Sequence, residues 1–164
     1  MKSLKSPKCV SWAVLKRRVA QWRQQGKIIA FTNGCFDILH WGHVSYLQAA
    51  KKGNRILVVG LNSDVSVRKI KGPARPINSQ KARALVLAAL EYVDFVTTFD
   101  EDTPYKLIKY VQPDILVKGA DWKGKEVAGS DIVKARGGRV ELIRYVPGYS
   151  TTKIIHEIEK GHKG

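Results

Sequence analysis

Cysteine and long apolar runs are scarce in this sequence. Cys9 and Cys35 are its only cysteines, too few for the disulfide framework of a small secreted protein. No apolar run has the length of a transmembrane helix, and the N-terminus lacks the apolar core of a signal peptide. We therefore expect a cytoplasmic protein that has no membrane partner.

Acidic residues are also scarce, above all at the start of the chain. The first is Asp37, and the formal net charge of the 164 residues is +15. Such a charge attracts polyanions, including nucleoside triphosphates, sugar phosphates and nucleic acid. One basic cluster covers residues 2–27, and we interpret it as a solvated helix or tail. A second cluster, from Arg68 to Arg83, follows an expected strand, where α/β proteins place ligand loops.

Apolar runs alternate with helical patterns along the chain. Strands are expected at 27–32, 55–61, 92–98, 115–118 and 139–144, and helices at 12–24, 41–52, 79–90, 104–110, 130–135 and 151–160. Asn78 is the expected N-cap of the 79–90 helix, and residues 62–77 are expected to form a basic loop. This alternation predicts a Rossmann-like α/β fold with a doubly wound, five-stranded parallel sheet. We expect a single domain over residues 1–164, with its core at about 26–160 and a basic N-terminal helix within 1–25.

The segment from Phe31 to His43 passes from a buried strand through a glycine turn into a helix. A helix N-terminus offers unpaired N–H groups and the positive end of the helix dipole, so anions bind there. Gly34 and Gly42 remove side chains that would hold a phosphate away. His40 and His43 are three residues apart and share one face of the first helical turn, where imidazoles can donate hydrogen bonds to phosphate oxygens.

This segment resembles the H-x-G-H signature of the nucleotidyltransferase superfamily, which includes cytidylyltransferases and class I aminoacyl-tRNA synthetases. The run Tyr149-Ser150-Thr151-Thr152-Lys153-Ile154 resembles the superfamily's second signature, a Ser/Thr-rich helix start. Between them stand Leu61-Asn62-Ser63-Asp64, Lys71-Gly72-Pro73-Ala74-Arg75-Pro76 and Val117-Lys118-Gly119-Ala120-Asp121-Trp122, in the order that the superfamily has. Over roughly residues 11–159 the chain resembles the adenylyltransferases of the ADP-heptose pathway.

The resemblance implies a reaction and its partners. ATP and D-glycero-β-D-manno-heptose 1-phosphate would give ADP-heptose and pyrophosphate for lipopolysaccharide or another glycan. Mg²⁺ would arrive mainly on the substrate phosphates, since no cluster of acidic, histidine or cysteine residues has the spacing of a built-in metal site. By resemblance we also expect a homodimer, in a stand-alone form that works with a separate heptose kinase.

The resemblance also assigns roles to residues, all of them near the carboxyl ends of expected strands. The catalytic candidates are His40, His43, Lys71 and Arg75. The nucleotide would contact Thr32, Asn33, Gly34, Phe36, Asp37, Gly42, Lys118, Gly119, Asp121, Trp122, Tyr149, Ser150, Thr151 and Thr152. The acceptor would contact Asn62, Asp64, Lys69, Lys71 and Arg75. Ligands of a doubly wound sheet collect at that edge.

Plainer interpretations stand beside these roles. The histidines taken alone fit a helix surface or a core, and the 68–83 cations fit an exposed loop. Ser150 or Thr151 fits an ordinary N-cap, and we interpret Asp37 as the cap of the helix that carries the histidines. Two other functions compete. One is a glycerol-3-phosphate cytidylyltransferase that uses CTP, and the more distant one is a basic nucleic-acid-binding module, for which the sequence has no recognisable motif.

Overall fold

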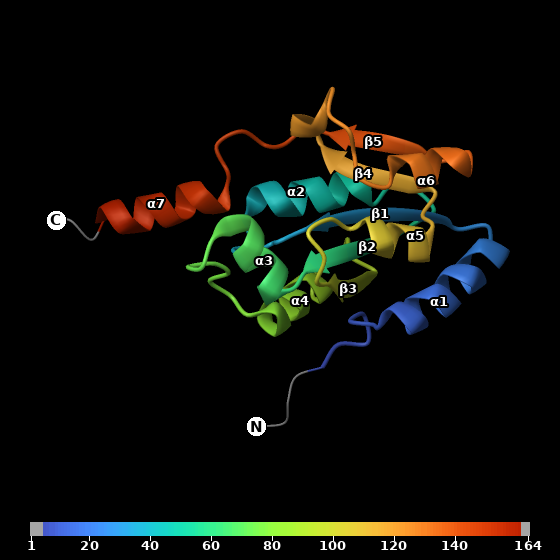
Figure 1. The fold of residues 1–164 in the computed structure, drawn as a ribbon, viewed down its shortest axis with the longest axis horizontal. Coiled ribbons are helices and arrows are strands. Elements are labelled where there is room, and N and C mark those ends of the chain that lie inside the picture. The colour runs from blue at the N-terminus through green and yellow to red at the C-terminus, as the bar shows by residue number, and fades with distance from the viewer. Residues whose placement is uncertain (1–4, 162–164) are drawn as a thin grey trace.

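A five-stranded parallel sheet forms the centre of the protein. The computed structural model describes residues 5–161, so Lys2 and the other first residues of the basic N-terminal segment lie outside the description. The strands are β1 (Ile28–Gly34), β2 (Arg55–Asn62), β3 (Phe95–Phe99), β4 (Ile115–Gly119) and β5 (Arg139–Ile143). Their spatial order is β3-β2-β1-β4-β5, and each neighbouring pair is parallel (Figure 1). The strand order therefore reverses at β1, which is the point where doubly wound folds bind ligands.

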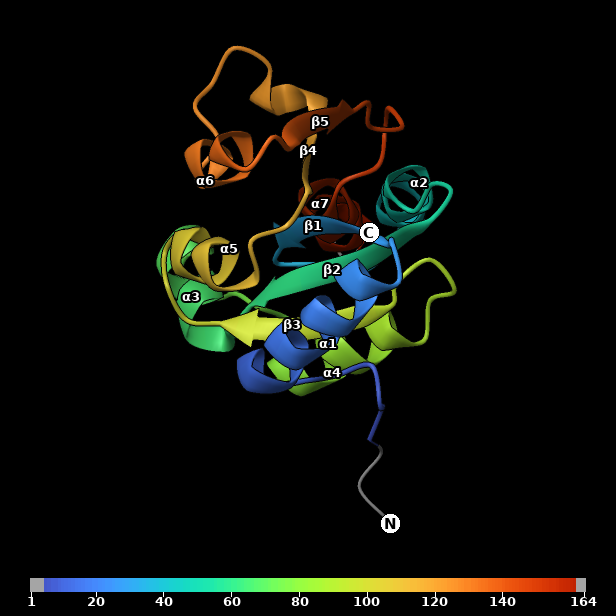
Figure 2. The same ribbon diagram turned by 90° about the vertical axis from the view of Figure 1, so that its right-hand side faces the viewer.

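Helices cover both faces of this sheet (Figure 2). They are α1 (Trp12–Gln24), α2 (Trp41–Ala50), α3 (Asp64–Lys71), α4 (Gln80–Ala88), α5 (Tyr105–Val111), α6 (Ser130–Ala135) and α7 (Thr151–Gly161), with a short 3₁₀ helix, η1 (Ala120–Trp122). The sequence prediction of a doubly wound, five-stranded parallel sheet is confirmed.

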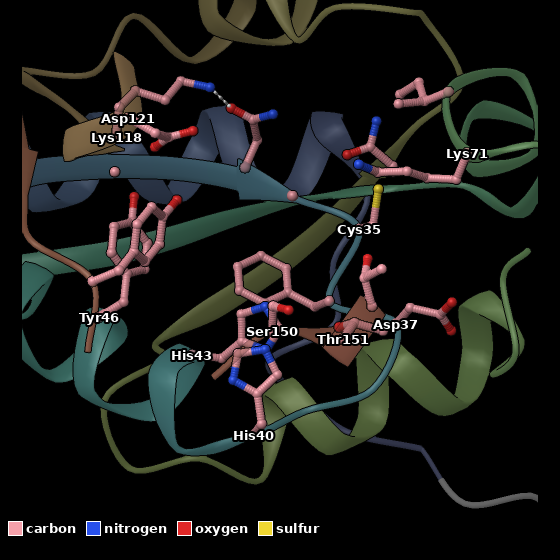
Figure 3. Close-up of a pocket in the computed structure, with 18 of the residues that line it drawn as sticks. Cys35, Asp37, His40, His43, Tyr46, Lys71, Lys118, Asp121, Ser150 and Thr151 are labelled. Atoms are coloured by element: carbon pink, nitrogen blue, oxygen red, sulfur yellow. Dashed lines mark hydrogen bonds between the residues drawn. The ribbon is translucent and has the colours of Figure 1, made fainter. Parts of the chain in front are cut away.

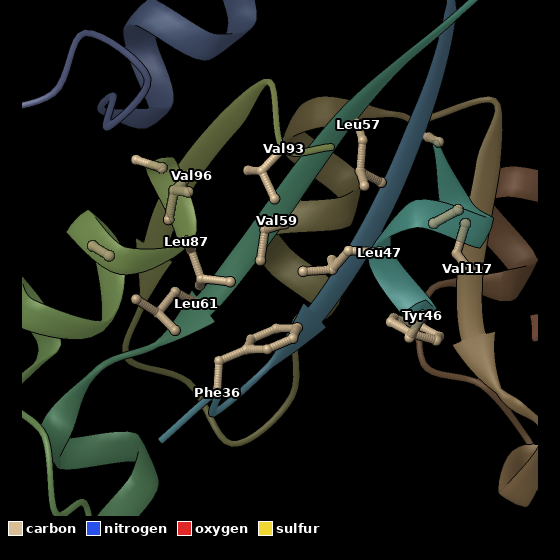
Figure 4. Packing of buried hydrophobic residues seen from close by; sticks show 14 of the residues in the cluster. Phe36, Tyr46, Leu47, Leu57, Val59, Leu61, Leu87, Val93, Val96 and Val117 are labelled. Carbon is tan, nitrogen blue, oxygen red and sulfur yellow. The ribbon is translucent and has the colours of Figure 1, made fainter. Parts of the chain in front are cut away.

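The apolar core consists of two clusters, one on each face of the sheet. Successive strand residues point to opposite faces, so Leu57 and Val59 of β2 join one cluster while Val58 joins the other. The first cluster packs the strands against α2 and α4, through residues such as Leu47 and Leu87 (Figure 4). The second packs them against α1 and α5. The sheet is thus fixed from both sides, and its carboxyl edge stays open for a site.

Two local predictions were wrong. Residues 62–77, expected to be a loop, contain helix α3. Its start is capped by Ser63, whose hydroxyl accepts a hydrogen bond from the Ser66 N–H, and Asp64 stands in its first turn, where the helix dipole favours an acid. The N-cap of α4 is Ser79, whose hydroxyl accepts from the Ala82 N–H; it is not Asn78.

The last helix, α7, extends away from the rest of the fold on the side to which the carboxyl ends of the strands point (Figure 1). None of its described residues is buried. Its first turn begins at Ser150, whose hydroxyl accepts a hydrogen bond from the Lys153 N–H at 3.1 Å. The Thr151 hydroxyl donates to the Ile38 carbonyl at 3.3 Å. This contact places the start of α7 beside the turn that follows β1.

Candidate functional site

A pocket of about 880 Å³ opens at the carboxyl ends of the strands. Figure 3 shows His40 and His43 together on one side of it, Lys118 and Asp121 at one end and Lys71 at the other. Most of the residues predicted from the sequence line this pocket: Asn33, Gly34, Phe36, Asp37, His40, His43, Asn62, Lys71, Arg75, Lys118, Gly119, Asp121, Trp122, Tyr149, Ser150, Thr151 and Thr152. Segments far apart in the chain therefore meet at one site.

The two histidines form a stacked pair at the start of α2. His40 is the N-cap residue in an extended conformation, and its ring centroid lies 3.8 Å from that of His43. Burial, followed by the neighbouring His40, lowers the pKa of His43 to about 4, and burial also lowers the pKa of His40. Within residues 5–161, neither buried Nδ1 atom has a hydrogen-bond partner. Because buried polar atoms are normally paired, this neutral pair is suited to bind a ligand's oxygen atoms.

Asp37 does not cap the histidine helix, contrary to the sequence interpretation. Its buried carboxylate accepts hydrogen bonds from the Ile77 N–H at 2.8 Å, the Asn78 N–H at 2.9 Å and Arg75 Nε at 2.6 Å. Burial raises the pKa of Asp37, but the Asn78 and Ile77 N–H groups and Arg75 outweigh it and bring the pKa below its ordinary value. The carboxylate thereby ties the turn after β1 to the segment before α4.

This pairing also changes the expected position of Arg75. One interpretation of the sequence put the 68–83 cations in an exposed loop, whereas the Arg75 side chain is held against Asp37 and is 17% exposed. Arg75 still lines the pocket. Lys71, at the end of α3, lines the pocket too, without an ion pair to any residue that the structure describes. Lys71 is therefore the more available of the two cations for a phosphate.

Arg83 is a structural residue of the site that sequence reasoning missed. Its side chain is fully buried and donates to the Cys35 carbonyl at 2.6 Å, the Asn78 carbonyl at 3.0 Å and Asp64 at 2.8 Å. One guanidinium thus joins three segments beneath the pocket. The available signal is its position four residues before Leu87, on the buried side of α4.

Aromatic rings gather at the end of the pocket formed by β4 and β5. Tyr46 and Tyr145 stack with their centroids 5.7 Å apart, and Tyr145 packs directly on the backbone of Gly119. Lys118 Nζ lies 4.9 Å from the ring centroid of Trp122. Tyr145 was not predicted; it comes two residues after the end of β5, and it packs against the glycine that ends β4.

Lys118 is the buried cation at this end. Its ammonium group donates a hydrogen bond to the Asn33 side-chain carbonyl, as the dashed line in Figure 3 marks. Burial lowers the pKa of Lys118 to about 8, although the nearby Asp121 carboxylate acts in the opposite direction. At neutral pH the amine is mostly protonated and presents a positive charge to an anionic ligand.

Four predicted residues stand behind the pocket wall or outside it. Thr32 is buried and its hydroxyl shares a 2.8 Å hydrogen bond with the Tyr46 hydroxyl. Asp64 pairs with Arg83, as described above. Lys69 lies 3.7 Å from Asp102 in an exposed ion pair. The buried Gly42 lets the loop before α7 approach, because a Cβ there would lie 3.1 Å from the His40 ring and 3.2 Å from the Tyr149 Cβ.

Comparison with known proteins identifies the class of site. A family model described as cytidylyltransferase-like matches residues 31–157, which include both the histidine turn and the start of α7. The chain belongs to this family. It is therefore a nucleotidyltransferase, and a nucleoside triphosphate is its co-substrate.

Individual relatives of this cytidylyltransferase-like chain are similar over most of its length. The bifunctional protein HldE of Wolinella succinogenes is 57% identical over 145 residues, which is 88% of this chain, and that of Campylobacter fetus is 61% identical over 136 residues, which is 83%. The chain spans 30% and 29% of those two proteins. The crystal structure of a lipopolysaccharide core biosynthesis protein from Thermoplasma volcanium is 32% identical, with a TM-score of 0.59, and the match covers 73% of this chain and 96% of that one.

Proposed function

We propose that this nucleotidyltransferase transfers AMP from ATP to D-glycero-β-D-manno-heptose 1-phosphate and forms ADP-heptose and pyrophosphate. The observation that carries the proposal is the meeting of the His40-x-Gly-His43 turn with the Ser150–Thr152 helix start at one pocket. The similarity to bifunctional HldE proteins and to a lipopolysaccharide core biosynthesis protein supports this substrate class. The reaction would supply an activated sugar, ADP-heptose, for lipopolysaccharide or another glycan.

The transfer needs no protein nucleophile. A phosphate oxygen of the sugar phosphate attacks the α-phosphorus of ATP in line, a new P–O bond forms, and the bond to the leaving pyrophosphate breaks. Catalysis of such a step rests on positioning and on stabilising the charge that develops on phosphate oxygens. The stacked His40 and His43 would donate hydrogen bonds to these oxygens. Lys71 would add a positive charge, and the N–H groups at the start of α7 would bind the β- and γ-phosphates.

Mg²⁺ fits this pocket as part of the incoming nucleotide. No group of three or more His, Cys, Asp or Glu residues within residues 5–161 could hold a metal ion. Of the acidic residues that line the pocket, Asp37 is engaged by Arg75 and two backbone N–H groups. Mg²⁺ commonly binds through substrate phosphates with few carboxylates. Asp121 also lines the pocket, at the end where Lys118 lies, and the ion would help to neutralise the triphosphate.

The competing functions differ in what they require of the molecule. A glycerol-3-phosphate cytidylyltransferase would share the histidine turn and the Ser-Thr-Thr helix start. The two functions can therefore be distinguished only by the substrates that the protein uses. A nucleic-acid module would need free aromatic residues among its basic ones. The Trp12 indole donates to the Thr98 carbonyl at 2.8 Å, and the Trp22 ring packs on Phe95. Both tryptophans are therefore used in packing, which weighs against that function.

The direct test is pyrophosphate release with Mg²⁺, in which ATP and CTP are each combined with heptose 1-phosphate and with glycerol 3-phosphate. We expect release with ATP and the heptose phosphate alone. Release with CTP and glycerol 3-phosphate would replace the proposal by the cytidylyltransferase alternative. Silence in all four mixtures, together with salt-dependent binding of an oligonucleotide, would favour the nucleic-acid module.

His43→Ala tests the catalytic assignment within this assay. We expect turnover to fall by at least about a hundredfold, the usual range for removal of a group that stabilises transition-state charge. The melting temperature should fall by a few degrees at most, because the ring lines the open pocket, although it also stacks on His40 and contacts Phe36. His156→Ala on the exposed part of α7 is the matched control and should leave both unchanged. Parallel losses of stability and activity in His43→Ala would contradict the assignment.

Several organisational predictions accompany the proposal. We expect a homodimer, which light scattering would detect, and a heptose kinase activity that supplies the sugar 1-phosphate. A single domain is supported by the two core clusters that share one sheet. Cys9 and Cys35 are free thiols, which is in keeping with the expected cytoplasmic location. None of the described helices is long and apolar enough to span a membrane.

A further inference from the structure

The two ends of the pocket differ in chemistry. The end at β4 and β5 is aromatic, with Tyr46, Trp122 and Tyr145 around a buried Lys118. The end at β2 and β3 is polar and comes from two other segments, the end of β2 and the loop between β3 and α5. The sheet order places β1, with the phosphate-binding turn that follows it, between these ends. Figure 3 shows Lys118 and Lys71 at opposite ends of the cavity.

The aromatic end suits a nucleoside. Flat rings and backbone groups bind a base by stacking and by hydrogen bonds to its edge, whereas a sugar rich in hydroxyl groups needs carboxylate, amide and hydroxyl partners. The polar end offers such partners in Asn62, Asp102 and Thr103. This assigns the two substrates of the transfer to opposite ends, with the reacting phosphates between them.

Asn62 is a preorganised acceptor at the polar end. It is only 4% exposed, and its Nδ2 donates to the Ser66 hydroxyl at 2.9 Å. The Ser66 hydroxyl in turn donates to the Glu101 carbonyl at 3.0 Å. This chain of hydrogen bonds fixes the amide and joins the end of β2, helix α3 and the β3–α5 loop. Ser66 accepts from one N–H of the amide and fixes its orientation, and Oδ1 remains an acceptor for a ligand hydroxyl.

Asp102 and Thr103 stand next to that fixed carbonyl of Glu101. The Asp102 side chain is 74% exposed and lies 3.7 Å from Lys69. Such an exposed ion pair is weak, so a ligand can replace it. A carboxylate repels a phosphate but accepts hydrogen bonds from sugar hydroxyls. The phosphate of the acceptor would therefore lie toward Lys71 and the histidines, and its hydroxyl groups toward Asp102.

We propose that Asn62, Asp102 and Thr103 form the subsite that binds the hydroxyl groups of the acceptor, a polyol or sugar phosphate. This inference rests on the proposed function, since it assumes that a sugar phosphate is the second substrate. It replaces Asp64 and Lys69, which the sequence suggested for this role, by residues of the β3–α5 loop. Asn62 is shared with the sequence prediction.

The test compares Asp102→Asn and Thr103→Val with the wild type in the pyrophosphate-release assay. We expect the KM for heptose 1-phosphate to rise about tenfold in Asp102→Asn, as for loss of one hydrogen bond to a charged group, and less in Thr103→Val. The KM for ATP should stay within about twofold. Asp100→Asn is the matched control: it makes the same charge change in the same exposed loop, outside the pocket lining, and should leave both KM values unchanged.

Three outcomes would overturn the subsite: an unchanged or lower acceptor KM in Asp102→Asn, equal increases in both KM values, or an equal effect in Asp100→Asn. The proposed function fails separately, if the wild type does not use heptose 1-phosphate. If glycerol 3-phosphate is used instead, the same KM ratios measured with that acceptor decide the subsite. If the wild type turns over neither acceptor and titration calorimetry detects no binding of heptose 1-phosphate, both proposals are wrong.

Discussion

Replacement of the buried Asp37 by Asn should destabilise the protein strongly, although the two side chains have almost the same shape. The Asp37 side chain is 1% exposed and that of its partner Arg75 is 17% exposed. The substitution removes the charge that assists three hydrogen bonds and leaves a partly buried guanidinium without its counter-ion. Breaking a buried pair by removing one partner costs roughly 3–5 kcal/mol, and the residual exposure of Arg75 favours the lower end of that range.

The assay is thermal unfolding at pH 7. For a chain of this size about 3 kcal/mol corresponds to a fall in melting temperature of roughly 6–12 °C. Asp100→Asn, a change in an exposed loop, should shift it by less than about 2 °C. Because folding lowers the pKa of Asp37, its contribution is present above the unfolded pKa of about 4 and is lost as the pH falls through the lower folded value. The difference between wild type and variant should therefore shrink in acid. Equal melting temperatures at pH 7 would refute this account of the turn.

Four further predictions concern the pocket. Burial holds the pKa of His43 near 4, and a bound phosphate should raise that pKa. Calorimetry at pH 6 should therefore detect proton uptake when the wild type binds ATP, and a smaller uptake when His43→Asn binds ATP. Equal proton uptake by the two proteins would contradict this. The same depressed pKa predicts that stability falls as the pH drops from about 6.5 toward 4. Lys118 has a pKa of about 8, so it loses its positive charge above pH 8 and the KM for ATP of the wild type should rise there. In Lys118→Met the KM for ATP should be high at every pH. Parallel pH profiles of KM in the two proteins would exclude a role of the Lys118 charge in ATP binding. Gly119→Ala would place a Cβ 2.1 Å from the Tyr145 ring, and this clash should weaken ATP binding and lower the melting temperature. The double variant Gly119→Ala/Tyr145→Ala should regain the melting temperature, because the clashing ring is gone. A double variant that stays as unstable as Gly119→Ala would rule out the clash.

The general fold could be predicted from the sequence because it depends on local patterns. Apolar runs such as 55–61 mark strands, and parallel strands bring their carboxyl ends to one edge. The motifs at His40, Lys118 and Ser150 therefore had to come together. Helix α3 was missed because its second half is basic and a glycine–proline segment follows it. Its N-cap, Ser63, and the acidic Asp64 in its first turn are signals that were present in the sequence.

The contacts that shape the site could not be predicted in the same way. Asp37 and Arg75 are 38 residues apart, and their pairing depends on how the segment before α4 folds back on the turn after β1. The buried Arg83 looks like one more member of a basic cluster until α4 is packed. Tyr145 on Gly119 depends on the register of β4 with β5. In each case the partner is set by tertiary packing, and the helical spacing of Arg83 and Leu87 indicates only that Arg83 lies on the buried side of α4.

The central claim is transfer of the α-phosphoryl group with its nucleoside. The most direct measurement incubates the protein with Mg²⁺, heptose 1-phosphate and ATP labelled with ³²P at the α-position, and then follows the label. The account predicts that the label appears in ADP-heptose and that unlabelled pyrophosphate is released in equal amount. Label that remains in ATP, or that appears in free AMP without a sugar nucleotide, would contradict it.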